Sequence, residues 1–135
     1  MRWSIIICSH NRAADLAENL PKVQALDYPL DRYEIIVVDN ASSDGTAAVA
    51  AAAGVGCVRE EHLGLSHARN RGIAESSGEL IVFIDDDAWP EPAWLQRLDD
   101  LFIDPCVGCA GGQVVPEWGE NGRTSWLHDR YVCFF

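Results

Sequence analysis

The sequence predicts an α/β domain in which an open, mostly parallel sheet carries helices on both of its faces. Short apolar runs rich in β-branched residues recur along the chain, and stretches with the apolar spacing of a helix lie between them. The runs are apolar throughout, which is typical of strands buried on both faces of a parallel sheet. The predicted strands are residues 3–8, 34–38, 55–59 and 80–84.

The first strand, Trp3–Cys8, precedes a stretch from Ala13 to Leu26 in which apolar residues have helical spacing. Because proline lacks a backbone N–H, Pro21 is expected to kink or end this helix. A loop then leads into the second strand, Glu34–Val38.

One further helix is expected before the third strand in the chain, and another after it. The alanine-rich residues 47–53 form the first of them, and Gly54 ends it. Residues 64–77 form the second, with Ser66 as a candidate cap and Gly78 as its end.

The chain after the fourth strand is expected to form a helix from Pro90 to Phe102, because proline is tolerated in the first turn of a helix. Residues 107–115 are expected to form a strand with a glycine break. Cys106 and Cys109 form a CxxC motif, but no second Cys or His pair has zinc-finger spacing. We therefore expect these two cysteines to be small buried residues.

Length and composition indicate one folded domain, since the chain has 135 residues of which 48% are hydrophobic. The formal net charge of −11 argues against nucleic acid or an anionic membrane as the main partner. No stretch approaches the roughly 20 apolar residues of a membrane span, and the N-terminus lacks the pattern of a signal peptide. Five irregularly spaced cysteines do not indicate a disulfide scaffold, so we expect a cytoplasmic location, at most peripheral to the inner face of the membrane.

Polar residues follow three of the predicted strands. Ser9-His10-Asn11-Arg12 ends the first strand, Asp39-Asn40 the second and Asp85-Asp86-Asp87 the fourth. In an open parallel sheet the ligand lies outside the carboxyl ends of the strands, so these side chains are expected to form one site. The GxGxxG and GxxxxGK[ST] motifs are missing after the first strand, which disfavours a nicotinamide dehydrogenase and a P-loop NTPase.

Three adjacent aspartates repel one another, and this cost calls for a counter-charge. In an extended segment Asp85 and Asp87 face one side and Asp86 the other. Two carboxylates on one side form a hard-oxygen site for Mg²⁺ or Mn²⁺, which could in turn hold a diphosphate. The alternative is a solvated acidic loop in which Asp87 caps the helix that begins near Pro90.

Four other residues have both a functional and a structural interpretation. Asp39 is a candidate to accept hydrogen bonds from a nucleotide, or it forms an Asx-turn or cap. Asp44 is expected to be more structural, because it directly precedes Gly45-Thr46 and a helix. Arg69 and Arg71 lie two apart on a helix and point in different directions, and the position in the motif favours Arg69 as the phosphate-facing one.

Three segments together resemble the nucleotide-binding half of the family-2 inverting glycosyltransferases with the GT-A fold, a Rossmann-like arrangement. The segments are WSIIICSHNR, EIIVVDNASSDGT and GLSHARNRGIAESSGELIVFIDDDAWP. The resemblance covers about residues 3–115, with the motifs in the family's order and spacing. It implies transfer of a sugar, with inversion, from a nucleotide-diphospho-sugar to a hydroxyl of a glycan or lipid-linked acceptor. A UDP-sugar would be the donor, and Mg²⁺ or Mn²⁺ the cofactor.

The resemblance also implies which residues bind the nucleotide. The end of the first strand would line the base and ribose pocket, and Asp39 would hydrogen-bond the base. Arg69 would reach the base or the diphosphate, and Asp86 would contact the ribose. The full set implied in nucleotide binding is Ser9, His10, Asn11, Arg12, Asp39, Ser42, Asp44, Arg69, Asp85 and Asp86.

The same resemblance makes Asp87, with help from Asp85, the holder of the metal on the diphosphate. The metal would act as a Lewis acid that stabilises the leaving nucleoside diphosphate. The chain departs from the family pattern at Cys8 and at Ser9-His10, where many members have proline and threonine-tyrosine. His10 can still stack on a base, so the implied pocket is retained.

The family's general base is an acidic residue further along the chain, which deprotonates the acceptor hydroxyl. We expect this base beyond Phe135, so that residues 1–135 are the donor-binding part of a truncated GT-A domain without its acceptor-binding part. Such a chain would bind the donor and lack transferase activity. Its apolar ending, Tyr131–Phe135, supports truncation and predicts self-association. No catalytic role is assigned to the acids near the end, Glu117, Glu120 and Asp129.

Two other functions stay open. A sugar nucleotidyltransferase also holds a nucleotide and a metal on this kind of sheet, but it normally has a glycine-rich basic loop where this chain has Ser9-His10-Asn11-Arg12. A non-catalytic nucleotide-binding or assembly module would use the same pocket as a sensor, or the apolar C-terminus as a docking surface.

Overall fold

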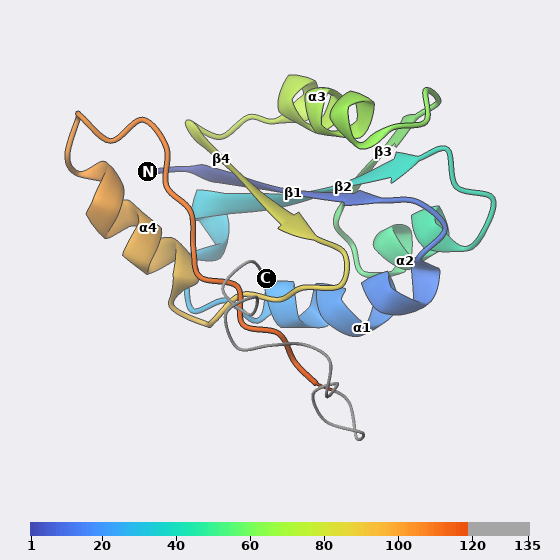
Figure 1. Ribbon diagram of the computed structural model, residues 1–135, viewed down its shortest axis with the longest axis horizontal. Coiled ribbons are helices and arrows are strands. Elements are labelled where there is room, and N and C mark those ends of the chain that lie inside the picture. The colour runs from blue at the N-terminus through green and yellow to red at the C-terminus, as the bar shows by residue number, and fades with distance from the viewer. Residues whose placement is uncertain (119–135) are drawn as a thin grey trace, which may run out of the picture. The chain divides into compact units, whose positions relative to one another are not determined.

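Four parallel strands form the centre of the molecule, in the spatial order β3-β2-β1-β4 (Figure 1). The computed structural model describes residues 1–118 of the chain. Several predictions concern Glu120, Asp129 and Tyr131–Phe135, which lie outside the described residues. The strands are β1 (Trp3–Ser9), β2 (Tyr33–Asn40), β3 (Gly56–Glu60) and β4 (Leu80–Asp85).

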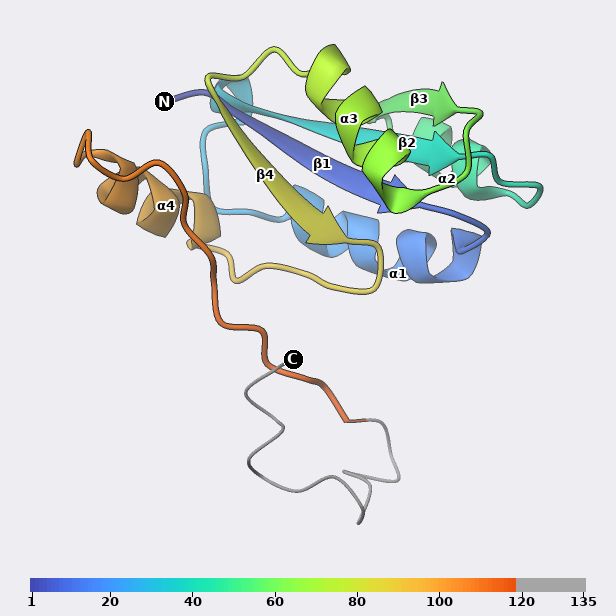
Figure 2. The ribbon, with the colours of Figure 1, turned by 45° about the horizontal axis from the view of Figure 1, so that its top comes forward.

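Helices cover both faces of this sheet, as the sequence predicts. Helix α3 lies on one face, whereas α1, α2 and α4 lie on the other (Figures 1 and 2). The helices are α1 (Ala13–Gln24), α2 (Thr46–Ala52), α3 (Leu65–Glu75) and α4 (Trp94–Phe102), and a short 3₁₀ helix, η1 (Leu30–Arg32), precedes β2.

The core follows from the alternation of side chains along the strands. On one face Ile6, Ile36 and Val38 are buried against Ala68 of α3. The approach of this helix is so close that a Cβ on Gly72 would lie 2.5 Å from the Ile6 Cγ2 atom. The other face buries the alternate residues of β1 and β2 under helices that contribute Leu16, Leu20, Val23, Leu95 and Leu98. The prediction of burial on both faces is wrong for β3 and β4, which are the edge strands of the sheet and are only partly buried.

The start and end of α3 differ from the prediction. Gly64, with a φ of 143°, precedes the helix, so Ser66 lies within its first turn and is not its cap. The helix ends at Glu75, before Gly78. Gly78 is required for another reason, because a Cβ there would lie 2.7 Å from the backbone nitrogen of Ser4.

Prolines explain two further differences. Helix α1 continues through Pro21 to Gln24, because a proline in the last turns removes only one hydrogen bond while buried Leu20 and Val23 hold the helix on the sheet. Helix α4 begins at Trp94 and not at Pro90. Residues 90–93 form the approach to the helix, since a proline at position 92 disfavours helical geometry in the residue before it.

Residues 1–103 form one compact unit, and residue 104 begins a second one. Within the second unit residues 107–118 have no regular secondary structure, so the strand predicted at 107–115 is not present. Cys106 and Cys109 are exposed, which contradicts their expected burial, because the segment that carries them is not packed into an element of secondary structure.

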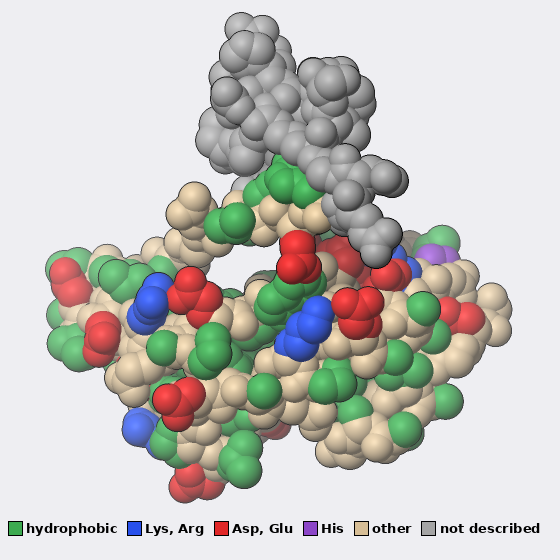
Figure 3. Space-filling model, turned by 90° about the horizontal axis from the view of Figure 1, so that it is seen from below, with side chains coloured by type: hydrophobic (Ala, Val, Ile, Leu, Met, Phe, Trp, Pro, Cys, Tyr) green, Lys and Arg blue, Asp and Glu red, His purple; other side chains and the backbone are tan. Residues whose placement is uncertain are grey.

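The surface of the described part reflects the acidic composition. Aspartate and glutamate side chains are spread over the face seen in Figure 3, with few lysine or arginine side chains between them. Among residues 1–118 no helix is long and apolar enough to cross a membrane.

Candidate functional site

The register of the parallel strands brings the predicted polar residues together at one edge of the sheet. Ser9 of β1 pairs with Asp39 of β2, and Cys8 pairs with Asp85 of β4. Because all four strands run in the same direction, their carboxyl ends meet at this edge (Figure 2). The predicted gathering of the strand ends is therefore present.

The three aspartates after β4 have different environments. Asp86 is only 6% exposed, and its carboxylate accepts a hydrogen bond from the Ser9 hydroxyl at 2.7 Å. Its backbone carbonyl accepts a second bond, from the Asn19 amide of α1 at 3.1 Å. Asp85 and Asp87 are exposed. The exposure alternates as expected, with the central aspartate held inward and its two neighbours exposed. The segment is not extended, however, because β4 ends at Asp85 and residues 86–87 form a turn in which the Ala88 nitrogen donates to the Asp85 carbonyl at 3.2 Å.

Arg12 connects this acidic segment to the end of β1. One guanidinium nitrogen lies 3.1 Å from Asp86 and 3.0 Å from Asp87, and Nε lies 3.1 Å from Asp15. The hydrogen bond to Asp87, followed by the charge of Asp86, raises the pKa of the Arg12 guanidinium. Asp87 does not cap α4, since that helix begins at Trp94.

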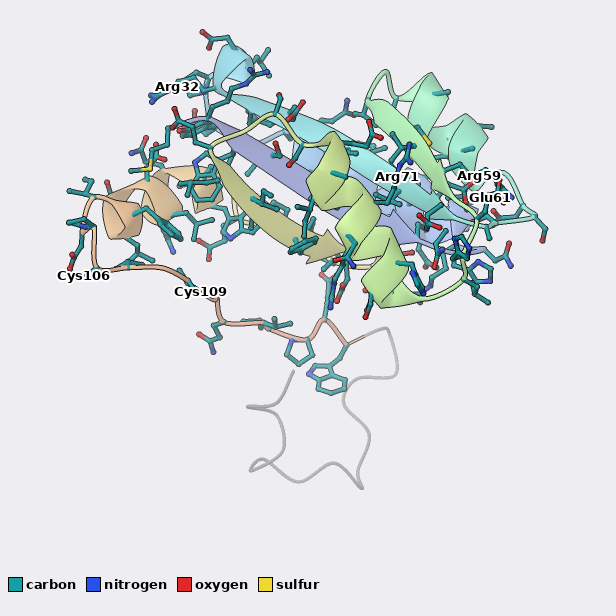
Figure 4. All side chains as sticks on the ribbon, turned by 90° about the horizontal axis from the view of Figure 1, so that it is seen from above. Arg32, Arg59, Glu61, Arg71, Cys106 and Cys109 are labelled. Carbon is teal, nitrogen blue, oxygen red and sulfur yellow. The ribbon has the colours of Figure 1, made fainter. Side chains whose placement is uncertain are left out.

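Asp39 forms a turn and an ion pair at the end of β2. It is 1% exposed, and its Oδ1 atom accepts a hydrogen bond from the Ser42 backbone nitrogen at 3.0 Å. Its Oδ2 atom accepts one from Arg59 of β3 at 2.8 Å. Arg59 also pairs with Glu61, beside it at the carboxyl end of β3 (Figure 4). Asp39 thus has the predicted structural role, although its bond reaches the backbone three residues on and not two as in an Asx-turn. Its proposed role toward a nucleotide stays a prediction.

The loop after β2 is held to the end of β1 by side chains on both sides. The Ser42 hydroxyl accepts a hydrogen bond from the Asn11 backbone nitrogen at 3.0 Å. Asp44 accepts bonds from the backbone nitrogens of Ala13 and Thr46, at 3.0 and 2.9 Å. Hydrogen bonds from Thr46 and Ala13 lower the pKa of Asp44. Asp44 is structural here, as expected from its place before α2.

A hollow of about 200 Å³ opens between the end of β1 and the start of α3. Asn40 shapes its wall, because its side chain bonds the backbone of Glu60, His62 and Gly64. The His10 ring donates to the Asn40 carbonyl at 2.7 Å. The residues that line the hollow are Cys8, Ser9, His10, Asn40, Leu63, Gly64, Leu65 and Ala68.

Two ionisable side chains, Cys8 and Arg69, influence the charge around the hollow. Burial raises the pKa of the Cys8 thiol to about 11, the charge of Arg69 opposes this shift, and Asp85 adds to it. Cys8 is therefore a neutral thiol at physiological pH. The Arg69 guanidinium lies 5.6 Å from the centre of the Phe83 ring in β4, whereas Arg71 pairs with Glu75 at 2.8 Å. The two arginines point in different directions, as predicted.

The donor set at this edge fits a magnesium or manganese ion that also binds phosphate. Within residues 1–118 no three His, Cys, Asp or Glu side chains are arranged to hold a metal by themselves. Asp85 and Asp87 nevertheless expose two hard carboxylates at the end of β4. Mg²⁺ usually takes one or two carboxylates and completes its shell with phosphate oxygens and water.

The site contains residues that sequence reasoning did not single out. Arg59 was missed, although it follows directly in register from Asp39 once β2 and β3 are paired. Asn19 was also missed, and its only signal was a polar residue among the apolar positions of α1. Glu117, to which no role was assigned, lies in the second unit.

The fold and the site define a class of protein: a Rossmann-like α/β domain with charged side chains gathered at the carboxyl ends of its strands. Residues 4–134 match the family described as Glycosyl transferase family 2. The chain belongs to this family, and its fold is the GT-A fold. Membership in this family does not support the sugar nucleotidyltransferase alternative.

Individual relatives agree with this assignment. The glycosyltransferase AglE of Haloferax volcanii is 32% identical over 135 residues, covering 96% of this chain and 44% of AglE. The mannosyltransferase PcManGT of Pyrobaculum calidifontis, solved with GDP-Man and Mn²⁺, is 32% identical with a TM-score of 0.72, covering 79% of this chain and 34% of that one. Glucosyl-3-phosphoglycerate synthase of Mycobacterium tuberculosis, solved with Mn²⁺, UDP and phosphoglyceric acid, is 26% identical with a TM-score of 0.64, covering 76% and 39%. The chain spans less than half the length of these relatives.

Proposed function

We propose that residues 1–135 are the donor-binding part of a metal-dependent, inverting glycosyltransferase. The observation that carries this proposal is the arrangement at the end of β4, where Asp86 is buried and fixed while Asp85 and Asp87 face solvent. A solvated acidic loop does not require one aspartate to be buried between two exposed ones. A site for a cation bridging to a diphosphate needs one or two accessible carboxylates on a rigid support, and Asp87 is half exposed although it pairs with Arg12.

The relatives support a nucleotide-sugar donor and a divalent ion. PcManGT binds GDP-Man with Mn²⁺, and glucosyl-3-phosphoglycerate synthase binds UDP with Mn²⁺. We propose a UDP-sugar as the donor of this chain. The alternative donor is a GDP-sugar, and the experiment below distinguishes the two bases. The acceptor we propose is a hydroxyl of a glycan or of a lipid-linked sugar.

Each part of the site has a role in this proposal. Asp87, with Asp85, would hold the cation on the diphosphate, where it supplies Lewis acidity for the departing nucleoside diphosphate. Asp39, with the end of β1, would bind the base and ribose. Arg69 faces the sheet beside β4 and would meet the negative charge of the donor. The general base for the acceptor hydroxyl is not assigned to any residue of this chain.

Calorimetric titration with UDP and with GDP, each with and without Mn²⁺, tests the proposal. We expect binding of UDP to require Mn²⁺, and Asp87→Asn to weaken this binding about 10- to 100-fold because one of two carboxylate ligands is lost. Asp100→Asn is the matched control, since it removes the same charge from an exposed position on α4.

If GDP binds more tightly than UDP, the proposed base is guanine instead of uracil, and the proposed position of the site stays the same. Binding of neither nucleotide in the presence of Mn²⁺ would refute the donor-binding role. Equal losses in Asp87→Asn and Asp100→Asn would refute the assignment of the metal to the end of β4.

A further inference from the structure

We propose that Arg12 competes with the divalent cation for Asp87, so that the affinity for metal depends on how readily this arginine gives up the carboxylate. The inference rests on the proposed function, because it takes Asp87 as a ligand of the cation. It goes beyond that function by making Arg12 a regulator of metal entry.

Geometry makes the two cations mutually exclusive at this oxygen. One nitrogen of Arg12 contacts Asp86 and Asp87 at 3.1 and 3.0 Å. A Mg²⁺ ion would bind a carboxylate oxygen at about 2.0–2.1 Å, within a few ångströms of the same guanidinium hydrogens. Since like charges at this distance repel strongly, Arg12 must move when the cation binds.

The support for the acidic segment does not depend on Arg12. Asp86 is held by the Ser9 hydroxyl at 2.7 Å, and its carbonyl is held by Asn19 at 3.1 Å. Both contacts are buried. The loop can therefore keep its conformation when the guanidinium leaves Asp87.

Arg12 is positioned so that it can leave Asp87. The Arg12 side chain is 46% exposed and the Asp87 side chain 52% exposed, so water screens their ion pair and the pair is weak. The contact of its Nε atom with Asp15, at 3.1 Å, can hold the side chain nearby after it releases Asp87. Among the ion pairs within residues 1–118, Arg12 is the only cation paired with Asp86 or Asp87.

Titration of the protein with Mn²⁺ alone, followed by the EPR signal of the free ion, tests the inference without any turnover. Arg12→Gln removes the competing charge and keeps a polar side chain of similar reach. We expect this variant to bind Mn²⁺ about tenfold more tightly than the unchanged protein, as the loss of one positive charge near a divalent ion predicts.

Two matched variants accompany it. Arg71→Gln makes the same charge change on α3, where the arginine pairs with Glu75, and is expected to leave Mn²⁺ affinity within about twofold of the original. Arg12→Lys keeps the positive charge at the site and is expected to return the affinity close to the original value.

Unchanged or weaker Mn²⁺ binding by Arg12→Gln overturns the inference, as does equal tightening by Arg71→Gln. If the unchanged protein still binds UDP with Mn²⁺ in these cases, the proposed function stands and only the role of Arg12 fails. If neither the protein nor the variant binds Mn²⁺ with or without nucleotide, both proposals fail together.

Discussion

The two ends of the parallel sheet both contain carboxylates, but they satisfy them in different ways. At the amino end Asp99 of α4 accepts hydrogen bonds from the Trp3 indole at 2.9 Å and from the Tyr28 hydroxyl at 2.6 Å. Glu34 accepts bonds from Ser4 and Ser77. At the carboxyl end arginines join the neutral donors, with Arg59 bound to Asp39 and Arg12 bound to Asp86 and Asp87.

This difference indicates that the carboxylates of the amino end stabilise the fold, whereas some of those at the carboxyl end can exchange their partners. The donors to Asp99 are themselves buried, since Trp3 is 1% and Tyr28 7% exposed, so no water can replace them cheaply. At the carboxyl end the pair of Arg12 with Asp87 is about half exposed on both sides and can exchange at small cost, whereas Asp39 and Asp86 are buried and hold their arginines more firmly. The amino end therefore fixes α4 on the sheet, while the carboxyl end retains groups that a ligand can recruit.

Another hollow within residues 1–118 agrees with this division. It measures about 660 Å³ and lies at the amino end, between the segment that follows α1 and the start of α4. Its lining includes one ionisable acid, Asp27, and none of the arginines or aspartates of the candidate site. Of these two hollows, the one with the greater volume lies away from the candidate site.

The largest effect is expected at the amino end. Asp99→Ala would leave the Trp3 indole and the Tyr28 hydroxyl without their acceptor, and we expect the free energy of unfolding to fall by about 2–4 kcal/mol. Urea denaturation measures this change. Asp100→Ala, at the next and exposed position of α4, is the control and is expected to change stability by less than about 0.5 kcal/mol. A loss in Asp99→Ala no greater than in this control would remove the basis of the comparison.

A smaller effect on stability is expected at the carboxyl end. Asp39→Asn keeps one carbonyl oxygen for the Ser42 nitrogen but loses the charge that pairs with Arg59. We expect the free energy of unfolding, measured in urea without ligand, to fall by about 1 kcal/mol. A loss larger than that of Asp99→Ala would show that the ion pairs of this end are structural rather than exchangeable.

The smallest effect concerns Glu34 and depends on pH. Burial alone would raise its pKa, but the hydrogen bonds from Ser4 and Ser77 outweigh burial and lower it. A carboxylate with a lowered folded-state pKa stabilises the fold above its unfolded value, near 4.3, and loses this contribution as the pH falls through the folded value. Glu34→Gln should therefore lower the free energy of unfolding by less than about 1 kcal/mol at pH 7, because solvent screens this partly exposed group. Denaturation at pH 7, 5, 4 and 3 checks the prediction, and a difference that grows below pH 4 would contradict it.

Much of the fold could be predicted because its signals are local. The run IIIC in β1 is apolar throughout, as a strand buried on both faces requires, and the helices between the strands follow from apolar spacing. LIVFI correctly predicted the strand β4 but not its partial exposure, which follows from its place at the edge of the sheet. The failures are at the ends of elements. Ser66 was a reasonable cap by type, but Gly64 with its positive φ precedes α3. The helix start predicted at Pro90 moved to Trp94, because Pro92 disfavours helix in the residue before it.

The candidate site was predictable to the extent that strand ends are. Asp85, Asp86 and Asp87 were expected to alternate, and their exposure does. The partners that hold them were harder to predict, since Asn19 and Arg12 are about 70 residues distant in the chain. Arg59 shows the same limit, as its pairing with Asp39 depends on the register of β2 against β3.

The sequence by itself determined the α/β class, the direction of the strands and the polar character of their carboxyl ends. These properties depend on which residues are apolar and on the order of the elements along the chain. Only the tertiary structure decided that Asp86 is held inward by Ser9 and Asn19, and that Arg12 and Arg59 pair with the aspartates of the site. The physical reason is that hydrogen bonds and ion pairs act over a few ångströms, so their partners are chosen only when distant segments are packed into register.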